Sequence, residues 1–232
     1  MNDPSRDTDG RGQLLRDFAF DSYGDDELRG SPELEACFRP LEHVLPSLVG
    51  PGTRLRYTPR GTQVALRFPG PQGYAHLDGL GLASNGDRYV PSAIVIVYLA
   101  DVGPDDSPFT AWPEAFPRVQ DLAWESLAGR PEEEVRQELV DLVYGQTLTE
   151  GAESLVGPAG STFLAHPALP HCGGPGIGAD IRYATLRRMY PTWSFAGSDL
   201  LPQTWPDAMR ILAAGPGELA PIARTVRSEC PV

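Results

Sequence analysis

The run AIVIVYLA, residues 93–100, constrains the fold of this chain more than any other stretch. It is apolar throughout and rich in β-branched residues, a pattern typical of a strand buried inside a protein. The run is also far too short to cross a bilayer. The sequence therefore predicts a buried strand within residues 89–102.

Other segments have the sequence patterns of shorter strands. Residues 53–68 alternate polar and apolar side chains, and β-type composition returns at residues 160–170 and 180–190. The chain holds 25 glycines and 24 prolines, which indicates many turns and irregular connections. Two groups of short strands separated by turns favour a β-sandwich or jelly roll, because a parallel α/β sheet would need helices alternating with strands throughout.

Helical patterns occupy two places. A helix is expected within residues 31–50, although Pro40 interrupts its apolar spacing. In RPEEEVRQELVDLVYG, Pro131 suits the first helical position and three glutamates follow it, which favours a helix start. This helix belongs to an insertion at about residues 117–145. We expect the insertion to cover the mouth of the barrel as a substrate lid, the alternative being a helix that only packs on the outer face of the sheet.

The 232 residues suffice for one domain with a full core, and no repeat or linker divides them. Residues 1–30 are dominated by Asp, Arg and Gly and are expected to form a flexible arm, followed by a single domain over residues 31–232. The N-terminal stretch lacks the apolar segment of a signal peptide, so a cytoplasmic protein is expected.

The charge of the chain excludes several classes of function. With 19 basic and 31 acidic residues the formal net charge is −12, so neither nucleic acid nor an anionic membrane is expected as a partner. All basic residues are arginine, and the lack of lysine excludes Schiff-base and Walker-type chemistry. The three cysteines are widely spaced and predict neither a disulfide framework nor a zinc-binding pair.

The motif HLD supplies the first candidate metal ligands. In extended backbone, side chains two positions apart point the same way, so His76 and Asp78 can converge on one ion. We expect His171 as the third ligand, because of its spacing to a following arginine, with His166 as its competitor. The remaining histidine, His43, lies on the expected N-terminal helix and is interpreted as structural.

Two imidazoles and one carboxylate form the facial triad of non-haem Fe(II), which leaves three coordination positions open. A bidentate 2-oxo acid fills two of them and O₂ the third. Arg182, on the strand that follows His171, offers a planar fork for the distal carboxylate of 2-oxoglutarate. Each of these residues alone is typical of a surface turn or salt bridge, and only their order, strand placement and spacing together favour an iron site.

With these residues the sequence resembles the phytanoyl-CoA dioxygenase-like Fe(II)/2-oxoglutarate-dependent oxygenases. The resemblance rests on HLD, on FLAHPALPHCGGPG at residues 163–176, on Arg182, and on VIVYLADVGPDDSPFTAWPEAF at residues 95–116. It implies a double-stranded β-helix (jelly-roll or cupin-like) core. It also implies hydroxylation of a small molecule, for example one of specialised metabolism, with decarboxylation of 2-oxoglutarate to succinate. Fe(II) would be held by His76, Asp78 and His171, and 2-oxoglutarate by Arg182, with O₂ as the other co-substrate.

The chain departs from the family at two positions that often carry a hydroxyl for the co-substrate. These are Gly173, two residues after the distal histidine, and Ala184, two residues after the arginine. Gln63 and Thr110 are candidates to compensate.

Several alternatives stay open at the level of sequence. A His₂Asp set also suits a zinc-dependent hydrolase or isomerase, which gives Arg182 no task, and a non-enzymatic binding jelly roll is a third class. Arg67, Arg187 and Arg188 are candidates to meet a substrate carboxylate or phosphate, but the sequence does not say which face of the strands they occupy. The substrate and the oligomeric state are not predicted.

Overall fold

The computed structural model describes most of the chain between residues 31 and 214. The described residues are 31–41, 45, 54–57, 62–82, 87–145, 148, 151–178 and 180–214. The expected arm at residues 1–30 and His43 lie outside this part of the chain. Among the described residues, no helix is both long and apolar enough to span a membrane.

The larger sheet is built around the long strand β8, Arg182–Pro191. On one side β8 pairs with β3, Ala93–Tyr98, which in turn pairs with β6, Thr162–Ala165. On its other side β8 pairs with β2, Thr62–Arg67, and with β1, Leu55–Arg56. All these pairings are antiparallel, and every residue of β3 is buried, as its β-branched sequence predicts.

A smaller antiparallel sheet has the order β5–β4–β7. Its strands are β5, Glu153–Leu155, β4, Phe109–Ala111, and β7, His171–Gly173. The segment around residues 70–76 runs beside β7 and is joined to it and its extension by isolated bridges, among them His76 with His171. The structure thus places a predicted ligand on each of two neighbouring antiparallel segments.

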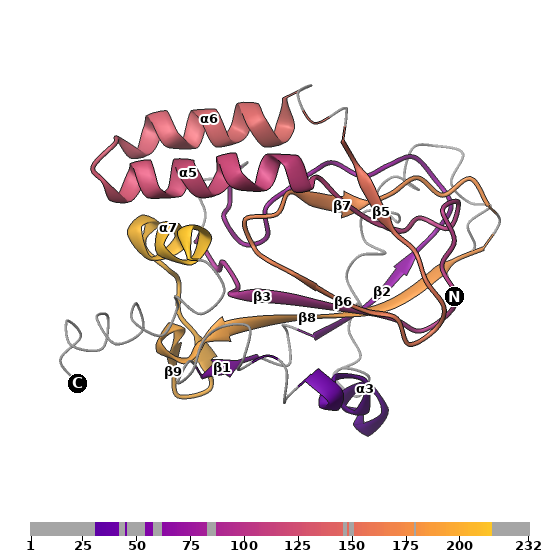
Figure 1. The fold of residues 1–232 in the computed structure, drawn as a ribbon. Coiled ribbons are helices and arrows are strands. Elements are labelled where there is room, and N and C mark those ends of the chain that lie inside the picture. Colours follow the sequence, from indigo (N-terminus) through magenta and orange to yellow (C-terminus); the bar gives the residue numbers. More distant parts are fainter. Residues whose placement is uncertain are drawn as a thin grey trace, which may run out of the picture.

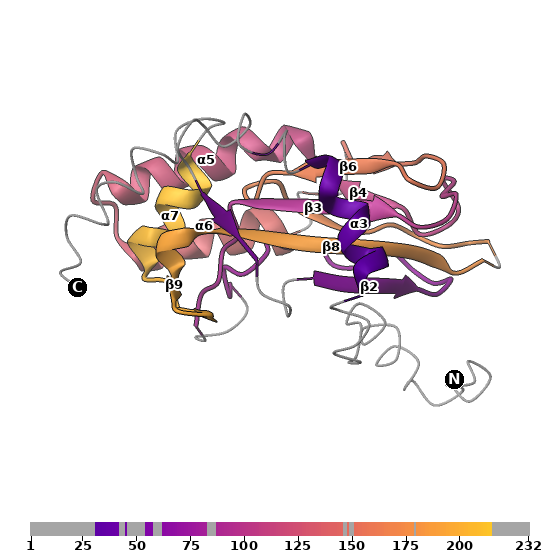
Figure 2. The same ribbon diagram turned by 90° about the horizontal axis from the view of Figure 1, so that it is seen from below.

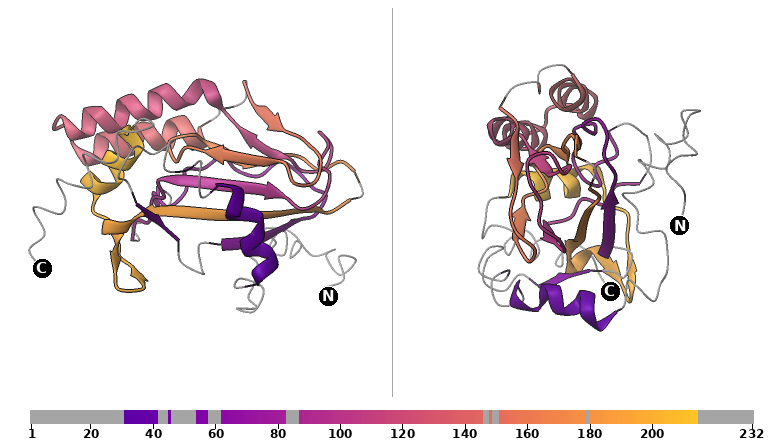
Figure 3. Two further views of the ribbon diagram at one scale, coloured as in Figure 1. Left: turned by 60° about the horizontal axis from the view of Figure 1, so that its bottom comes forward. Right: turned by 90° about the vertical axis from the view of Figure 1, so that its right-hand side faces the viewer.

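The two sheets lie face to face (Figure 3), and side chains of the core lie between them. The side chains that fill this space come from both sheets: Ala65, Ile94, Ile96, Tyr98, Phe109, Ala111, Ala165 and Ala184. A short hairpin of β9, Phe195–Ala196, and β10, Asp199–Leu200, follows the 3₁₀ turn Thr192–Ser194. The predicted fold class, mainly β with flanking helices, is confirmed.

Helix α3, Pro32–Phe38, covers the outer face of the larger sheet (Figure 2). It starts with Ser31 as N-cap and continues into a 3₁₀ turn at Arg39–Leu41, which contains the predicted interruption at Pro40. Arg187, on β8, holds the helix against the sheet through cation–π contacts. Its Cζ lies 3.9 Å from the centroid of the Phe38 ring and 3.8 Å from that of the Tyr57 ring.

The predicted insertion is a pair of helices, so the expectation of one helix there was incomplete. After a 3₁₀ turn at Pro113–Ala115, α5 spans Phe116–Leu127 and α6 spans Glu132–Tyr144. Pro131 is the N-cap of α6, one position before the predicted one. Helix α7, Trp205–Ala213, which the sequence analysis missed, packs against α5 (Figure 1).

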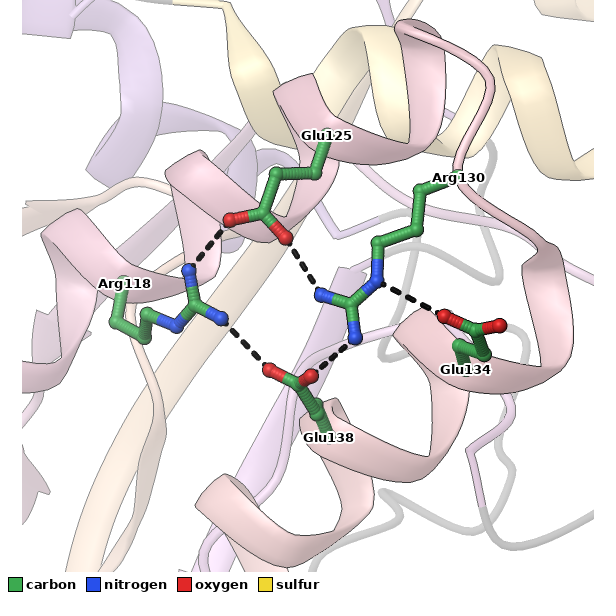
Figure 4. Close-up of polar contacts among 5 residues, drawn as sticks. All are labelled: Arg118, Glu125, Arg130, Glu134 and Glu138. Atoms are coloured by element: carbon green, nitrogen blue, oxygen red, sulfur yellow. Dashed lines mark hydrogen bonds and ion pairs between the residues drawn. The ribbon is translucent and has the colours of Figure 1, made fainter.

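A network of charged side chains joins α5 to α6 on their exposed surface (Figure 4). Arg118 bonds Glu125 at 2.7 Å and Glu138 at 2.6 Å, and Arg130 contacts Glu125, Glu134 and Glu138. Because these groups are largely solvated, the network fixes the register of the two helices more than it stabilises the fold.

The helices also hold the segment that carries the HLD motif. Leu77, between the two predicted ligands, is buried in a core cluster with residues of α5, α6 and α7, including Val119, Leu139 and Met209. Its neighbours His76 and Asp78 point away from this cluster towards each other. The helical layer therefore anchors the motif from behind, and the substrate lid remains a prediction.

Candidate metal centre

His171 meets His76 and Asp78 in space although it lies far from both in the sequence. One ligand atom from each lies within 4.8 Å of the others. Nε2 of His76 is 3.5 Å from Oδ1 of Asp78, and Nε2 of His171 is 3.9 Å from Oδ2. The structure brings together the three residues that the sequence predicted as ligands, and it places His171 at the start of strand β7.

The backbone explains why the two histidines face each other. The N–H of His76 donates to the carbonyl of His171 at 3.0 Å, and the N–H of His171 donates back at 3.1 Å. Residues bridged in this way are direct cross-strand neighbours with side chains on the same face. The two rings are accordingly 4.5 Å apart between centroids, and Phe109 stacks on the far side of His171 at 5.0 Å.

Both imidazoles are held in the tautomer that a metal ion requires. Nδ1 of His76 lies 3.1 Å from the carbonyl oxygen of Tyr74, and Nδ1 of His171 lies 2.9 Å from that of Leu169. A carbonyl only accepts, so each Nδ1 carries the proton and each Nε2 keeps its lone pair towards Asp78. Hydrogen bonds of this kind orient histidine ligands and raise their basicity.

Asp78 is fixed by a two-pronged ion pair with Arg188. Nε of Arg188 donates to Oδ2 at 2.7 Å and Nη2 donates to Oδ1 at 3.1 Å. The carboxylate is buried, with 7% of its side chain exposed. Each oxygen retains a further lone pair, so the pair with Arg188 aims the carboxylate without using up its capacity to bind a cation.

The charges of the site follow from burial and from this ion pair. Burial raises the pKa of Asp78, but the positive charge of Arg188 outweighs it, helped by the hydrogen bond that Nε2 of His76 donates when that ring is protonated, and the pKa of Asp78 is held well below its usual range. Burial lowers the pKa of His76, and the hydrogen bond and negative charge of Asp78 outweigh this and raise it overall. Burial, assisted by the charge of His76, lowers the pKa of His171 to about 4.

The metal-free protein is therefore expected to lose stability between about pH 6.5 and pH 4 because of His171. Over this range the unfolded chain binds a proton that the folded protein does not bind, so the free energy of unfolding falls as the pH falls. The loss is about 1.4 kcal/mol per pH unit and about 3 kcal/mol in total. The titration of His76 affects the stability above this pH range, because its pKa is raised. The titration of Asp78 affects the stability below this range, because its pKa is lowered.

Urea denaturation of metal-free wild type and of His171→Asn, between pH 7 and pH 4.5, measures this effect. The variant is expected to show a shallower decline than wild type. Equal declines in the two proteins would mean that His171 is not buried in its neutral form.

Arg188→Met is expected to destabilise the metal-free protein by about 3 kcal/mol, because it leaves the buried Asp78 charge uncompensated. Added Mn(II) should restore part of this loss, since the cation then neutralises the same carboxylate. Thermal denaturation with and without Mn(II) compares the variant with wild type and with Arg188→Lys. A metal-induced rise in Tm no larger in Arg188→Met than in wild type would argue against this role for Asp78.

Arg182 lies on the inner face of β8, apart from the triad. Its residue is 4% exposed, Nη1 donates to the carbonyl of Ser107 at 2.9 Å, and Nε is buried without a hydrogen-bond partner. Within the described part of the chain no carboxylate forms an ion pair with it. Burial lowers the pKa of Arg182 to about 10, and the charge of Arg67 adds to this shift. A buried guanidinium in this state is suited to an anionic ligand.

The competitor His166 has a structural role. Its Nδ1 accepts from the N–H of Ala168 at 3.1 Å, so its Nε2 carries the proton, which it donates to the carbonyl of Ala214 at 2.8 Å. Burial lowers the pKa of His166, consistent with a neutral ring.

Thr110, a predicted helper for the co-substrate, has its hydroxyl 3.1 Å from that of Ser154 and lies on the opposite face of β4 from Phe109. The side chain of Gln63 is outside the described part.

The structure also settles which faces the three other arginines occupy. Alternation along β8 puts Arg182 and Arg188 on the inner face and Arg187 on the outer face, under α3. Arg67 follows the inward-facing Ala65 by two positions on β2 and also lies inside. The ion pair of Arg188 with Asp78 was not predicted, because face assignment depends on register. Once Arg182 is known to face inward, Arg188 must also face inward, because it lies an even number of positions further along the same strand.

No family model and no curated protein sequence matches this chain. Among solved structures it is similar to the non-haem α-ketoglutarate-dependent carbocyclase SnoK from nogalamycin biosynthesis, with 15% identity, a TM-score of 0.52 and 88% of both chains covered. It is also similar to apo HygX from Streptomyces hygroscopicus, with 19% identity, a TM-score of 0.48, and 88% of this chain and 89% of HygX covered. The likeness to SnoK confirms the predicted jelly-roll core.

Proposed function

We propose that this chain is an Fe(II)- and 2-oxoglutarate-dependent oxygenase of the phytanoyl-CoA dioxygenase-like type, with His76, Asp78 and His171 as the iron ligands. The observation that carries the proposal is the orientation of the two imidazoles. Both Nδ1 atoms are tied to backbone carbonyls, and both Nε2 atoms face one buried carboxylate. This is the donor set of a facial triad, which binds iron on one side and leaves the other side for ligands.

The second support is the buried guanidinium of Arg182. It lies on the inner face of the larger sheet and pairs with no carboxylate within the described residues. A distal carboxylate of 2-oxoglutarate would supply the missing negative charge, and the guanidinium fork would orient the co-substrate. Bound iron would supply the activation of O₂ that couples decarboxylation of 2-oxoglutarate to oxidation of a substrate C–H bond.

The substrate class in this proposal is a small molecule, and hydroxylation is the expected outcome. Phe109, stacked on His171, contributes an apolar wall on that side of the site. SnoK, with the same fold, is described as a carbocyclase from nogalamycin biosynthesis. Ring formation is therefore a second outcome for which this scaffold is suitable.

An anaerobic titration tests the proposal. Wild type with Fe(II) is expected to develop a weak visible charge-transfer absorption on addition of 2-oxoglutarate, with one equivalent of each. His76→Ala should lose this absorption, whereas His166→Gln, which changes a histidine outside the site, should keep it. Absence of the absorption in wild type, or its persistence in His76→Ala, would contradict the proposal.

The same titration separates the zinc hydrolase hypothesis. A zinc enzyme would bind Zn(II) in the His₂Asp set but would form neither the absorption nor succinate with Fe(II), 2-oxoglutarate and O₂. It would also leave the buried Arg182 without a function, which is the reason for preferring the oxygenase.

A further inference from the structure

Two arginines lie side by side inside the sandwich. Arg67 on β2 and Arg182 on β8 are direct partners in the antiparallel register. Both are buried, with 8% and 4% of the residue exposed. Like charges in directly opposed positions repel each other, and burial removes the water that would screen them. The fold keeps this arrangement even though Nε of Arg182 has no hydrogen-bond partner.

The guanidinium of Arg67 occupies the space that a side chain at position 173 would need. A Cβ added to Gly173 would lie 2.5 Å from Nη1 and 2.6 Å from Cζ of Arg67. Gly173 is two positions after His171 on β7, so this space opens on the same face as the metal ligand. The Nη2 of Arg67 also donates to the carbonyl of Pro71 at 3.0 Å, which fixes the group beside the strand.

These contacts give a reason for the departure from the family at Gly173. The position that often carries a hydroxyl for the co-substrate is a glycine here, and an arginine from another strand fills the resulting room. The hydroxyl at position 110 is not a substitute, since it lies beside Ser154.

We propose that Arg67 is a second binding residue for the distal carboxylate of the 2-oxo diacid, acting beside Arg182 in place of the hydroxyl at position 173. The inference rests on the proposed function and extends it to a residue that the family resemblance does not supply. Two guanidinium groups from neighbouring strands clamp one carboxylate, and the carboxylate in turn offsets their mutual repulsion.

The first test measures selectivity between two co-substrates by calorimetry with Ni(II)-loaded protein. 2-Oxoglutarate has the distal carboxylate, and 2-oxopentanoate has a methyl group in its place. Arg67→Met is expected to weaken 2-oxoglutarate binding by roughly 10- to 100-fold and to leave 2-oxopentanoate binding unchanged. Arg67→Lys, which keeps the charge but loses the fork, should fall between wild type and Arg67→Met.

The second test is a double-mutant cycle with Gly173→Ser. In the wild-type background the new side chain displaces the Arg67 guanidinium, so 2-oxoglutarate affinity should fall. In the Arg67→Ala background the space is empty and the added hydroxyl should raise the affinity. A change of sign between the two backgrounds is the result expected only if the two residues compete for one place beside the ligand.

The outcomes separate the inference from the proposed function. If wild type binds 2-oxoglutarate tightly and Arg67→Met keeps the full preference over 2-oxopentanoate, the assignment of Arg67 is wrong and the oxygenase proposal stands. If Gly173→Ser lowers affinity equally in both backgrounds, the assignment is also wrong. If Ni(II)-loaded wild type binds no 2-oxoglutarate, both proposals fall.

Discussion

Replacing His171 by alanine is expected to lower the affinity for Fe(II) by at least roughly 100-fold, because loss of an outer partner alone costs 10- to 100-fold and a direct ligand is worth more. Succinate formation from 2-oxoglutarate should fall with it. The residue is well suited to this role, since its pKa of about 4 keeps the ring neutral and ready to coordinate at pH 7. Anaerobic metal titration and succinate assay measure the two effects.

The matched control for this variant is His166→Gln. It alters a buried histidine whose two ring nitrogens are both engaged by the backbone. The control should retain Fe(II) affinity within a small factor. Equal Fe(II) affinity in wild type and His171→Ala would show that His171 is not a ligand.

Arg182→Met is expected to weaken 2-oxoglutarate binding by roughly 100-fold or more, since it removes a buried charged donor to the ligand. The variant should nevertheless fold as stably as wild type, because the buried guanidinium has an unpartnered Nε and no described carboxylate partner to lose. Methionine fills a similar volume without a charge. Calorimetry and urea denaturation on the same preparation separate binding from stability.

A contrary result would be a large fall in the free energy of unfolding with unchanged 2-oxoglutarate affinity. Arg182 would then be a structural residue that supports Ser107 through its hydrogen bond. Arg56→Met, at a surface-exposed strand position, serves as the control for loss of an arginine in general.

The fold class and the grouping of His76, Asp78 and His171 were predictable from short sequence patterns. A β-branched run specifies the buried β3, and alternation places His76 and Asp78 on one side with Leu77 on the other. The spacing of His171 to Arg182 singled it out as the third candidate ligand, although its position on a strand was not predicted.

The remaining parts depend on pairing between distant segments, which a single sequence does not specify. The inward face of β8, and with it the ion pair of Arg188 with Asp78, follows from the register of the larger sheet. Gly173 looked like the loss of a useful hydroxyl until the structure placed Arg67 in the same space. Helix α7 was not predicted although Thr204 and Asp207 form a capping box at its start, because its flanking sequence is rich in proline and alanine.

Anomalous diffraction from crystals grown with Mn(II) and 2-oxoglutarate tests the central claim most directly, since Mn(II) is a close substitute for Fe(II) that does not oxidise readily. We expect one strong peak bonded to Nε2 of His76, Nε2 of His171 and a carboxylate oxygen of Asp78, with the distal carboxylate of 2-oxoglutarate against Arg182. A protein that binds Mn(II) elsewhere, with these three side chains uncoordinated, would contradict the account.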